Sequence, residues 1–149
     1  MHFDLAGRIE QLSPERIVTL KHVSAAEEYL QDHFPTFPVL PGVLMLEAMV
    51  QAARRLAEAH PAHDPAGPPL VLGRVRALKY GRFVKPGSTL RVEVSLVRPP
   101  EGGLWDFKGE GRVLDPRAPG DPPLAVSGRL TLRPATVGAP PVVSAGLRG

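Results

Sequence analysis

The chain has 149 residues, of which 43% are hydrophobic and 22% are charged. This length suits a single domain with one substantial core, and the composition excludes wholesale disorder and fibrous structure. The sequence contains no cysteine, which excludes disulfides, thiolate metal sites and cysteine nucleophiles. The net charge of +3 is mild and no basic run alternates with aromatic residues, so we expect no nucleic-acid partner despite a pI of about 9.7.

Residues 3–23 are expected to form a β-hairpin. They contain two stretches in which apolar and polar residues alternate, separated by a Ser-Pro-Glu turn at 13–15. Ser24 and Glu27 then form a capping-box pattern, which predicts a short helix through residue 30.

The segment 41–60 is the long helix that the sequence predicts. It is rich in helix formers, and Pro41 suits the first helical turn, where its missing N–H is not needed. Before it, three prolines make residues 32–42 a stiff, irregular loop. The first half of the helix is apolar on nearly every side and should be buried, whereas charged residues from Arg54 onward make its second half amphipathic.

Membrane insertion is not expected. The longest strongly apolar run, residues 43–53, is interrupted by Glu47 and Gln51 and is too short to cross a bilayer. Residues 1–7 lack a basic segment followed by an apolar stretch, so they do not read as a secretory signal. Together with the absence of cysteine, this favours a cytoplasmic protein.

The second half of the chain is expected to form an antiparallel sheet. A proline-rich linker ends the helix, and four β-like stretches separated by turn residues follow at 71–83, 89–97, 104–114 and 124–132. One helix among five or six strands predicts an α+β domain in which the sheet wraps around the helix. This domain should span residues 1–133, and residues 134–149, rich in Pro, Gly and Ala, should be a flexible tail.

Glu47 is the most unusual polar residue, since it lies within the apolar half of the predicted helix. A carboxylate there would lose hydration and is seldom buried without a partner, which suits a proton donor or acceptor in a catalytic site. It could instead be a rim residue facing solvent, or pair with Arg54 or Arg76. Gln51 lies one helical turn later on the same face and could hydrogen-bond to it.

Two further positions could contribute chemistry. His33 heads the proline loop, and imidazole is well matched to proton transfer near neutral pH, although loop histidines are commonly ordinary surface residues. Gly42 offers a backbone N–H at the positive end of the helix dipole, although backbone geometry alone also explains a glycine there. The His60, His63 and Asp64 pattern is too weak to predict a metal site.

Residues 33–51, HFPTFPVLPGVLMLEAMVQ, closely resemble the signature of bacterial 3-hydroxyacyl-acyl carrier protein dehydratases. Residues 79–87, KYGRFVKPG, resemble more loosely the strand and turn that follow the central helix in this family. The resemblance extends over roughly residues 3–132. It implies a hot-dog fold, in which a curved antiparallel sheet wraps a long central helix and two chains pair edge to edge, with active sites at the dimer interface. It also implies a possible association of three dimers into a hexamer.

The resemblance further implies the reaction, which is elimination of water from a 3-hydroxyacyl thioester to give the trans-2-enoyl product. His33 of one chain would abstract the C2 proton, Glu47 of the partner would protonate the departing hydroxyl, and the Gly42 N–H would bind the thioester oxygen. Gln51 would orient Glu47. No metal or organic cofactor is expected, because proton transfer and electrostatics suffice.

The acyl carrier protein is the partner that this resemblance implies. Arg54, Lys79, Arg82 and Lys85 could form a basic rim for that acidic protein, or could simply be a solvated face. Glutamate at position 47 resembles the branch of the family that dehydrates without isomerising.

Three departures from the family pattern suggest a divergent member that serves a specialised lipid or polyketide pathway. They are Thr36, Phe37 and Phe83, and residues 115–123 resemble an inserted loop. Two other functions stay open at this point, a hot-dog acyl thioesterase and a non-catalytic acyl-binding protein.

Overall fold

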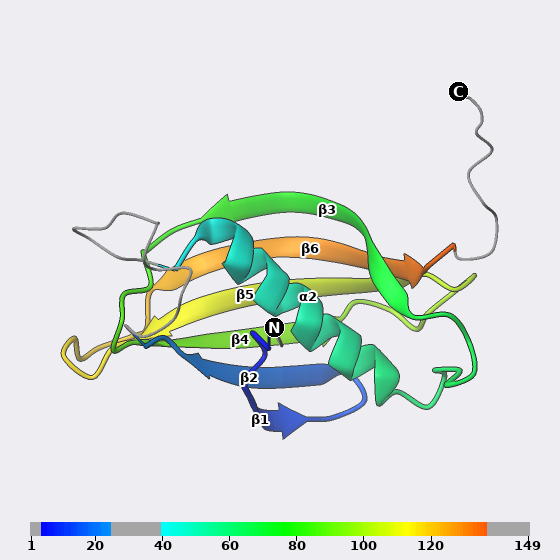
Figure 1. The fold of residues 1–149 in the computed structure, drawn as a ribbon, viewed down its shortest axis with the longest axis horizontal. Helices are drawn as coiled ribbons and strands as arrows, with labels where there is room; N and C mark the ends of the chain where they lie inside the picture. The colour runs from blue at the N-terminus through cyan, green and yellow to red at the C-terminus, as the bar shows by residue number, and fades with distance from the viewer. Residues whose placement is uncertain (1–3, 25–39, 137–149) are drawn as a thin grey trace.

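The structure is a computed structural model that describes residues 4–24 and 40–136. A single long helix lies against one antiparallel sheet of six strands in the order β1-β2-β4-β5-β6-β3 (Figure 1). The elements are β1 (Arg8–Leu12), β2 (Arg16–His22), α2 (Gly42–Glu58), β3 (Leu70–Tyr80), β4 (Thr89–Leu96), β5 (Trp105–Leu114) and β6 (Leu124–Pro134). This confirms the α+β class, the hairpin, the long helix and the four later strands, with boundaries that differ by a few residues.

Several sequence predictions fall outside the described residues. The short helix expected from Ser24 and nearly all of the proline loop over 32–42 belong to this group. The flexible tail, and with it the domain boundary at residue 133, also stays a prediction, since the description ends at Thr136. Up to that point the chain is held, because the Ala135 N–H donates to the Pro69 carbonyl at 2.8 Å.

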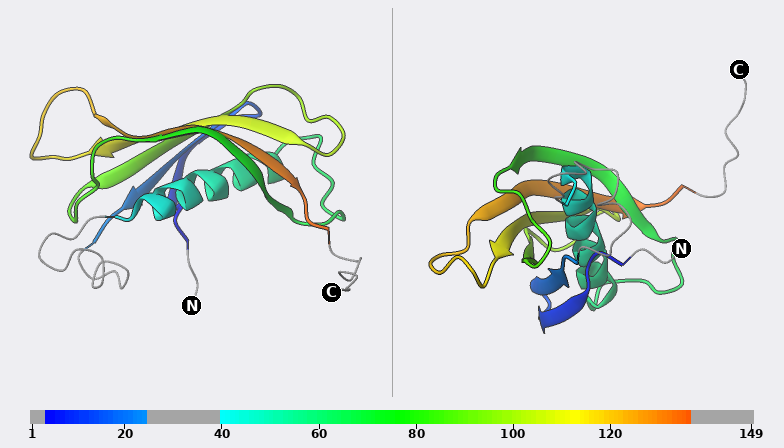
Figure 2. Two further views of the ribbon diagram at one scale, coloured as in Figure 1. Left: turned by 90° about the horizontal axis from the view of Figure 1, so that it is seen from above. Right: turned by 60° about the vertical axis from the view of Figure 1, so that its left-hand side comes forward.

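The sheet curves around α2, which lies on its concave face (Figure 2). Side chains of β4 and β5 alternate between this face and the outer one, so Leu90, Val92 and Phe107 are fully buried. On the helix, Met49 and Leu56 pack into the same core cluster. Burial of these apolar surfaces holds the two layers together, at about 25 cal/mol for each Å² removed from water.

Gly109 of β5 determines how closely α2 approaches the sheet. It is buried under the helix, and a Cβ at this position would lie only 3.0 Å from Sδ of Met49. A larger residue would therefore push α2 outward or force Met49 into another rotamer. The distance between α2 and the sheet is therefore set at Gly109, five residues before the end of β5.

The expected burial of the first half of α2 on all sides is wrong for the single chain. Val43 is 66% exposed, and Leu44 and Leu46 are only partly buried. The sheet covers one side of the helix, and the opposite side of its first turns presents apolar surface to solvent. Among the described residues, no helix is long and apolar enough to cross a membrane.

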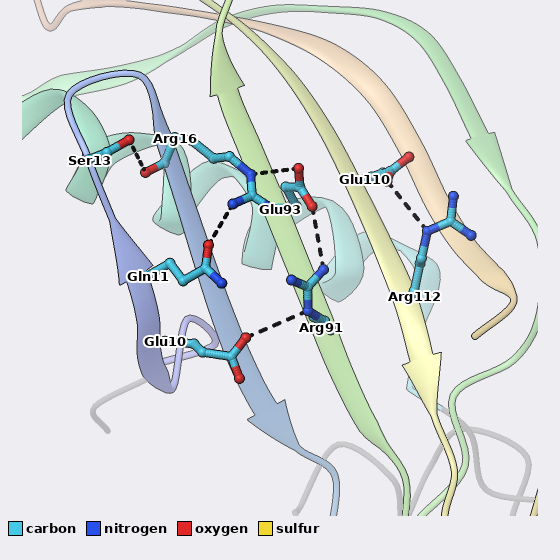
Figure 3. A network of polar contacts seen from close by, with 8 residues as sticks. All are labelled: Glu10, Gln11, Ser13, Arg16, Arg91, Glu93, Glu110 and Arg112. Carbon is cyan, nitrogen blue, oxygen red and sulfur yellow. Dashed lines mark hydrogen bonds and ion pairs between the residues drawn. The ribbon is translucent and has the colours of Figure 1, made fainter. Parts of the chain in front are cut away.

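The outer face of the sheet carries a network of ion pairs over β1, β2 and β4 (Figure 3). Arg16 Nε lies 2.7 Å from Glu93 Oε2, and Arg91 bridges Glu93 and Glu10 at 3.4 and 3.7 Å. The hydrogen bond from Arg16, together with the charge of Arg91, lowers the pKa of Glu93 although its partial burial acts in the opposite direction. The carboxylate form of Glu93 is therefore favoured by folding.

We predict that Glu93→Gln lowers the free energy of unfolding at pH 7 by about 0.5–1 kcal/mol, the scale of a partly exposed ion pair. Because the pKa of Glu93 is lowered on folding, its contribution is present above pH 4.5 and is lost as the pH falls through the folded-state pKa. Urea unfolding between pH 3 and 7 checks this, with the exposed Glu101→Gln as control. A difference between Glu93→Gln and wild type that does not shrink on acidification would contradict the prediction.

Candidate active site

Three polar side chains of α2 lie in a row at intervals of four residues, which places Glu47, Gln51 and Arg55 on one face of the helix. Glu47 and Gln51 are half-buried, and the chain segment just before β1 lies alongside them. Polar groups therefore line this face at the border of the core, and the buried residues of α2, from Met45 to Ala57, point into the core.

The expected hydrogen bond between Gln51 and Glu47 is present. Nε2 of Gln51 donates to Oε2 of Glu47 at 3.0 Å. At the other end of the amide, Oε1 of Gln51 accepts from the backbone N–H of Leu5 at 2.7 Å and from that of Ala6 at 3.2 Å. Two backbone donors can face only the oxygen of the amide, so they determine which end of Gln51 points at Glu47.

The start of α2 offers a free backbone donor. Pro41 precedes the helix with φ −59° and ψ 143°, and its carbonyl accepts from the N–H groups of Leu44 and Met45. Among the described residues no group accepts from the N–H of Gly42, which points along the positive end of the helix dipole. Glu47 lies five residues further on, about 7.5 Å along the helix axis at 1.5 Å per residue.

Tyr80, at the end of β3, lies against this helix start. A Cβ at Gly42 would be 3.0 Å from the Tyr80 ring, so the absence of a side chain at Gly42 allows the ring to lie there. Tyr80 is itself half-exposed. The glycine thus has a packing role in addition to leaving its N–H open to a ligand.

The alternative in which Glu47 forms an ion pair is wrong for the described residues. Arg54 donates through Nε to the Leu70 carbonyl at 3.0 Å, and neither Arg54 nor Arg76 pairs with Glu47. His33 lies outside the described residues, so its place beside Glu47 stays a prediction.

The proposed carrier-binding residues fall into two separate places. Lys79, Arg82 and Lys85 are exposed at the end of β3 and in the turn that follows it. Arg54 instead contacts Leu70, at the opposite end of the same strand. The structure therefore brings three of the four basic residues together and leaves Arg54 apart.

Arg82 and Lys85 border a pocket of about 260 Å³ together with Phe83. Its far wall is formed by Asp115 and the loop that follows, which is the segment resembling an insertion. The pKa of Asp115 is lowered chiefly by hydrogen bonds from Arg117, whose Nε lies 2.9 Å from Oδ1, so this carboxylate is already paired with a cation.

His60 and Asp64 of the linker have structural partners. His60 packs edge-on against Trp105 with ring centroids 5.3 Å apart, and its Nδ1 accepts from the Ala62 N–H at 3.0 Å. Asp64 accepts from the Ala66 N–H at 2.9 Å. No group of three or more metal-ligating side chains occurs among the residues that the structure describes.

The contact of the 4–7 segment with Gln51 was not anticipated from the sequence. The alternation of apolar and polar residues over 5–9 predicts a strand there, whereas β1 begins only at Arg8. A local signal is present, because Asp4 followed by Gly7 is typical of a turn in which the aspartate caps backbone N–H groups. Nothing in the sequence indicates that this turn meets a residue 46 positions later.

The chain is similar in sequence to known proteins over most of its length. Residues 1–115 match the model of the FabA-like domain family. Over 128 residues the chain is 41% identical to the 3-hydroxyacyl-[acyl-carrier-protein] dehydratase FabZ of Natranaerobius thermophilus, covering 85% of this chain and 83% of that protein.

Solved structures support the fold alone. AziG from S. sahachiroi superimposes with a TM-score of 0.65 at 16% identity, over 87% of this chain and 91% of that one. The dehydratase heterocomplex ApeI:P from Xenorhabdus doucetiae gives 0.57 at 19% identity, over 85% and 94%. The long helix on a curved antiparallel sheet is thus the predicted hot-dog fold, and the chain belongs to the FabA-like domain family.

Proposed function

We propose that this protein removes water from 3-hydroxyacyl thioesters carried by acyl carrier protein, giving trans-2-enoyl thioesters in fatty acid or related lipid and polyketide biosynthesis. The observation that carries the proposal is the half-buried carboxylate of Glu47, oriented by Gln51 and lying five residues beyond Gly42, whose N–H no described residue accepts from. The similarity to FabZ over most of both chains supports the same reaction.

The first requirement of the reaction is a stabilised thioester oxygen. Removal of a C2 proton places negative charge on this oxygen, and a preorganised N–H at a helix N-terminus stabilises that charge. The Gly42 N–H is unused by the described residues and belongs to the first turn of α2, where N–H groups point out of the helix N-terminus, which supports this role.

The second requirement is a base that removes the proton from C2 and an acid that protonates the hydroxyl on C3. In the proposed mechanism His33 of one subunit takes the C2 proton, the electrons of the C2–H bond form the double bond, and the C3–O bond breaks. Glu47 of the other subunit gives its proton to the leaving hydroxyl, which departs as water. Transfer of the proton held by His33 back to Glu47 restores the starting state, so no proton or electron is left over. Neither a metal nor an organic cofactor takes part in this scheme.

We predict that Glu47→Gln lowers kcat by about 10²–10⁴-fold, because the amide has the shape of the side chain but no proton to donate. His33→Ala should have an effect of similar size. The assay follows the absorbance of the enoyl thioester and the loss or gain of one water by mass spectrometry. Glu58→Gln, an exposed residue on the same helix, is the matched control and should retain wild-type activity.

The same assay tests the other candidate functions. If the wild-type protein releases free thiol, it is a thioesterase, and if it binds the thioesters unchanged, it is an acyl-binding protein. Either result would refute the dehydratase proposal, as would full activity in Glu47→Gln.

We propose a homodimer joined through β3. This strand has 11 residues, forms one edge of the sheet and, within residues 4–24 and 40–136, pairs only with β6. A long, uncovered edge strand is an open template for pairing with a second chain. Near its end, Tyr80 and Val43 expose apolar surface at the start of α2, which a second subunit would cover. Assembly of dimers into a hexamer, and a location in the cytoplasm, stay predictions from the sequence.

We predict that Val43→Asp shifts the protein from dimer to monomer with little change in the folding of each chain, because Val43 is already exposed in the single chain. Sedimentation equilibrium across a range of protein concentrations checks this. Val97→Asp, at an exposed apolar residue just after β4, is the control and should remain dimeric. A wild-type protein that is monomeric would rule out this assembly.

We predict that Arg82→Glu raises KM several-fold for a substrate on acyl carrier protein but leaves KM unchanged for the same acyl group on pantetheine alone. Only the carrier protein presents an acidic surface, and the effect should weaken with added salt. Arg129→Glu, an exposed change of the same charge on the outer face of β6, is the control. Equal KM changes for both substrates would show that Arg82 does not bind the carrier protein.

A further inference from the structure

The Asp4 carboxylate both closes the turn formed by residues 4–7 and attaches it to α2, beside the bonds from Leu5 and Ala6 to Gln51. Oδ1 of Asp4 accepts from the N–H groups of Ala6 at 3.1 Å and Gly7 at 3.3 Å, and from Nη2 of Arg55 at 3.1 Å. The first two bonds close the turn, and the third attaches it to the helix one turn beyond Gln51.

This turn is packed closely into the molecule. Leu5 and Ala6 are almost completely buried, and Gly7 adopts φ 60°, which favours glycine. A Cβ at Gly7 would lie 2.3 Å from the Leu20 carbonyl oxygen of β2, closer than any side chain allows. The backbone N–H groups of Leu5 and Ala6 are therefore held at fixed positions between α2 and β2.

Through Gln51, these two N–H groups determine which amide group faces the carboxylate of Glu47. They bind Oε1 of Gln51, so its Nε2 must face Glu47 and donate to Oε2. A hydroxyl oxygen of a carboxylic acid is a weaker acceptor than its carbonyl oxygen, so the bond from Gln51 to Oε2 favours Oε1 of Glu47 for the acidic proton and for the substrate hydroxyl. Without the turn, the Gln51 amide could rotate by half a turn and present its oxygen to Glu47 instead.

We propose that Asp4 and Arg55 are positioning residues for Glu47, acting through the 4–7 turn and the side-chain amide of Gln51. The proposal rests on the dehydratase function proposed above, and extends it to residues that touch neither substrate nor Glu47.

A purely structural role would give a different result from a positioning role. The Asp4–Arg55 pair is partly exposed, with side-chain exposures of 34% and 36%, so its loss should have a small effect on stability. The Arg16–Glu93 pair on the outer face is comparable, at 38% and 28%, and lies on strands rather than beside Glu47. Glu93→Ala is therefore a matched control for removing an ion pair.

In the enzyme assay, Asp4→Ala and Arg55→Ala should each lower kcat about tenfold and change KM by less than twofold, the pattern for an interaction lost in the transition state. Asp4→Asn retains Oδ1 as an acceptor and should recover most of kcat. Because both residues act through Gln51, adding Asp4→Ala to Gln51→Met should lower kcat no further. Glu93→Ala should leave kcat unchanged.

A second measurement does not depend on activity. In ¹⁵N spectra of the full chain, the side-chain amide of Gln51, assigned by its loss in Gln51→Met, should exchange slowly with solvent. In Asp4→Ala and Arg55→Ala this exchange should become at least several-fold faster, while Glu93→Ala leaves it as in wild type.

The outcomes separate the two proposals. An active wild type in which Asp4→Ala and Arg55→Ala retain full kcat overturns the positioning role and leaves the dehydratase function standing. An inactive wild type refutes the function, and the Gln51 exchange rates then still decide whether the turn orients the amide. Additive losses in the double variant, or unchanged exchange in Asp4→Ala, also overturn the inference.

Discussion

The packing of α2 into the concave face of the sheet is the constraint on which the rest of the structure depends. Five strands and the linkers between them contribute side chains to the surface that receives the helix. Gly109 sets the closest approach, and the buried residues on either side of it fix the rotation of the helix about its axis. Because that rotation is fixed, the residues of α2 that are not in the core have fixed directions too.

The polar row of α2 is a consequence of this rotation. Glu47 and Gln51 lie where the core meets its border, so they are dry enough for strong hydrogen bonds and open enough to meet a ligand. A carboxylate in such a place needs a hydrogen-bond partner of defined orientation. Gln51 is that partner, and the backbone N–H of Leu5 fixes its orientation. The stability of the fold and the geometry of the site are thus linked through one helix face.

Much of the fold could be predicted because local signals agree with it. Pro41 and the proline-rich linker delimit α2, and alternation of apolar residues marks β4 and β5. Glu47 and Gln51 could also be paired from their spacing alone. The strand order, with β3 beside β6 at the edge, and the contact of Leu5 with Gln51 could not, because both depend on tertiary packing between distant segments. The same holds for the exposed side of α2, where the pattern predicted burial that a single chain does not supply.

The close contact of Met49 with Gly109 also limits where a long substrate can go. At this point no space for a hydrocarbon chain is left between α2 and β5. A fatty acyl group bound near Glu47 cannot pass between Met49 and Gly109, and the exposed apolar surface at the start of the helix, where Val43 and Tyr80 lie, offers it another path. In the proposed dimer this surface lies at the subunit boundary, so the length of acyl chain that fits could change there without any change in the core.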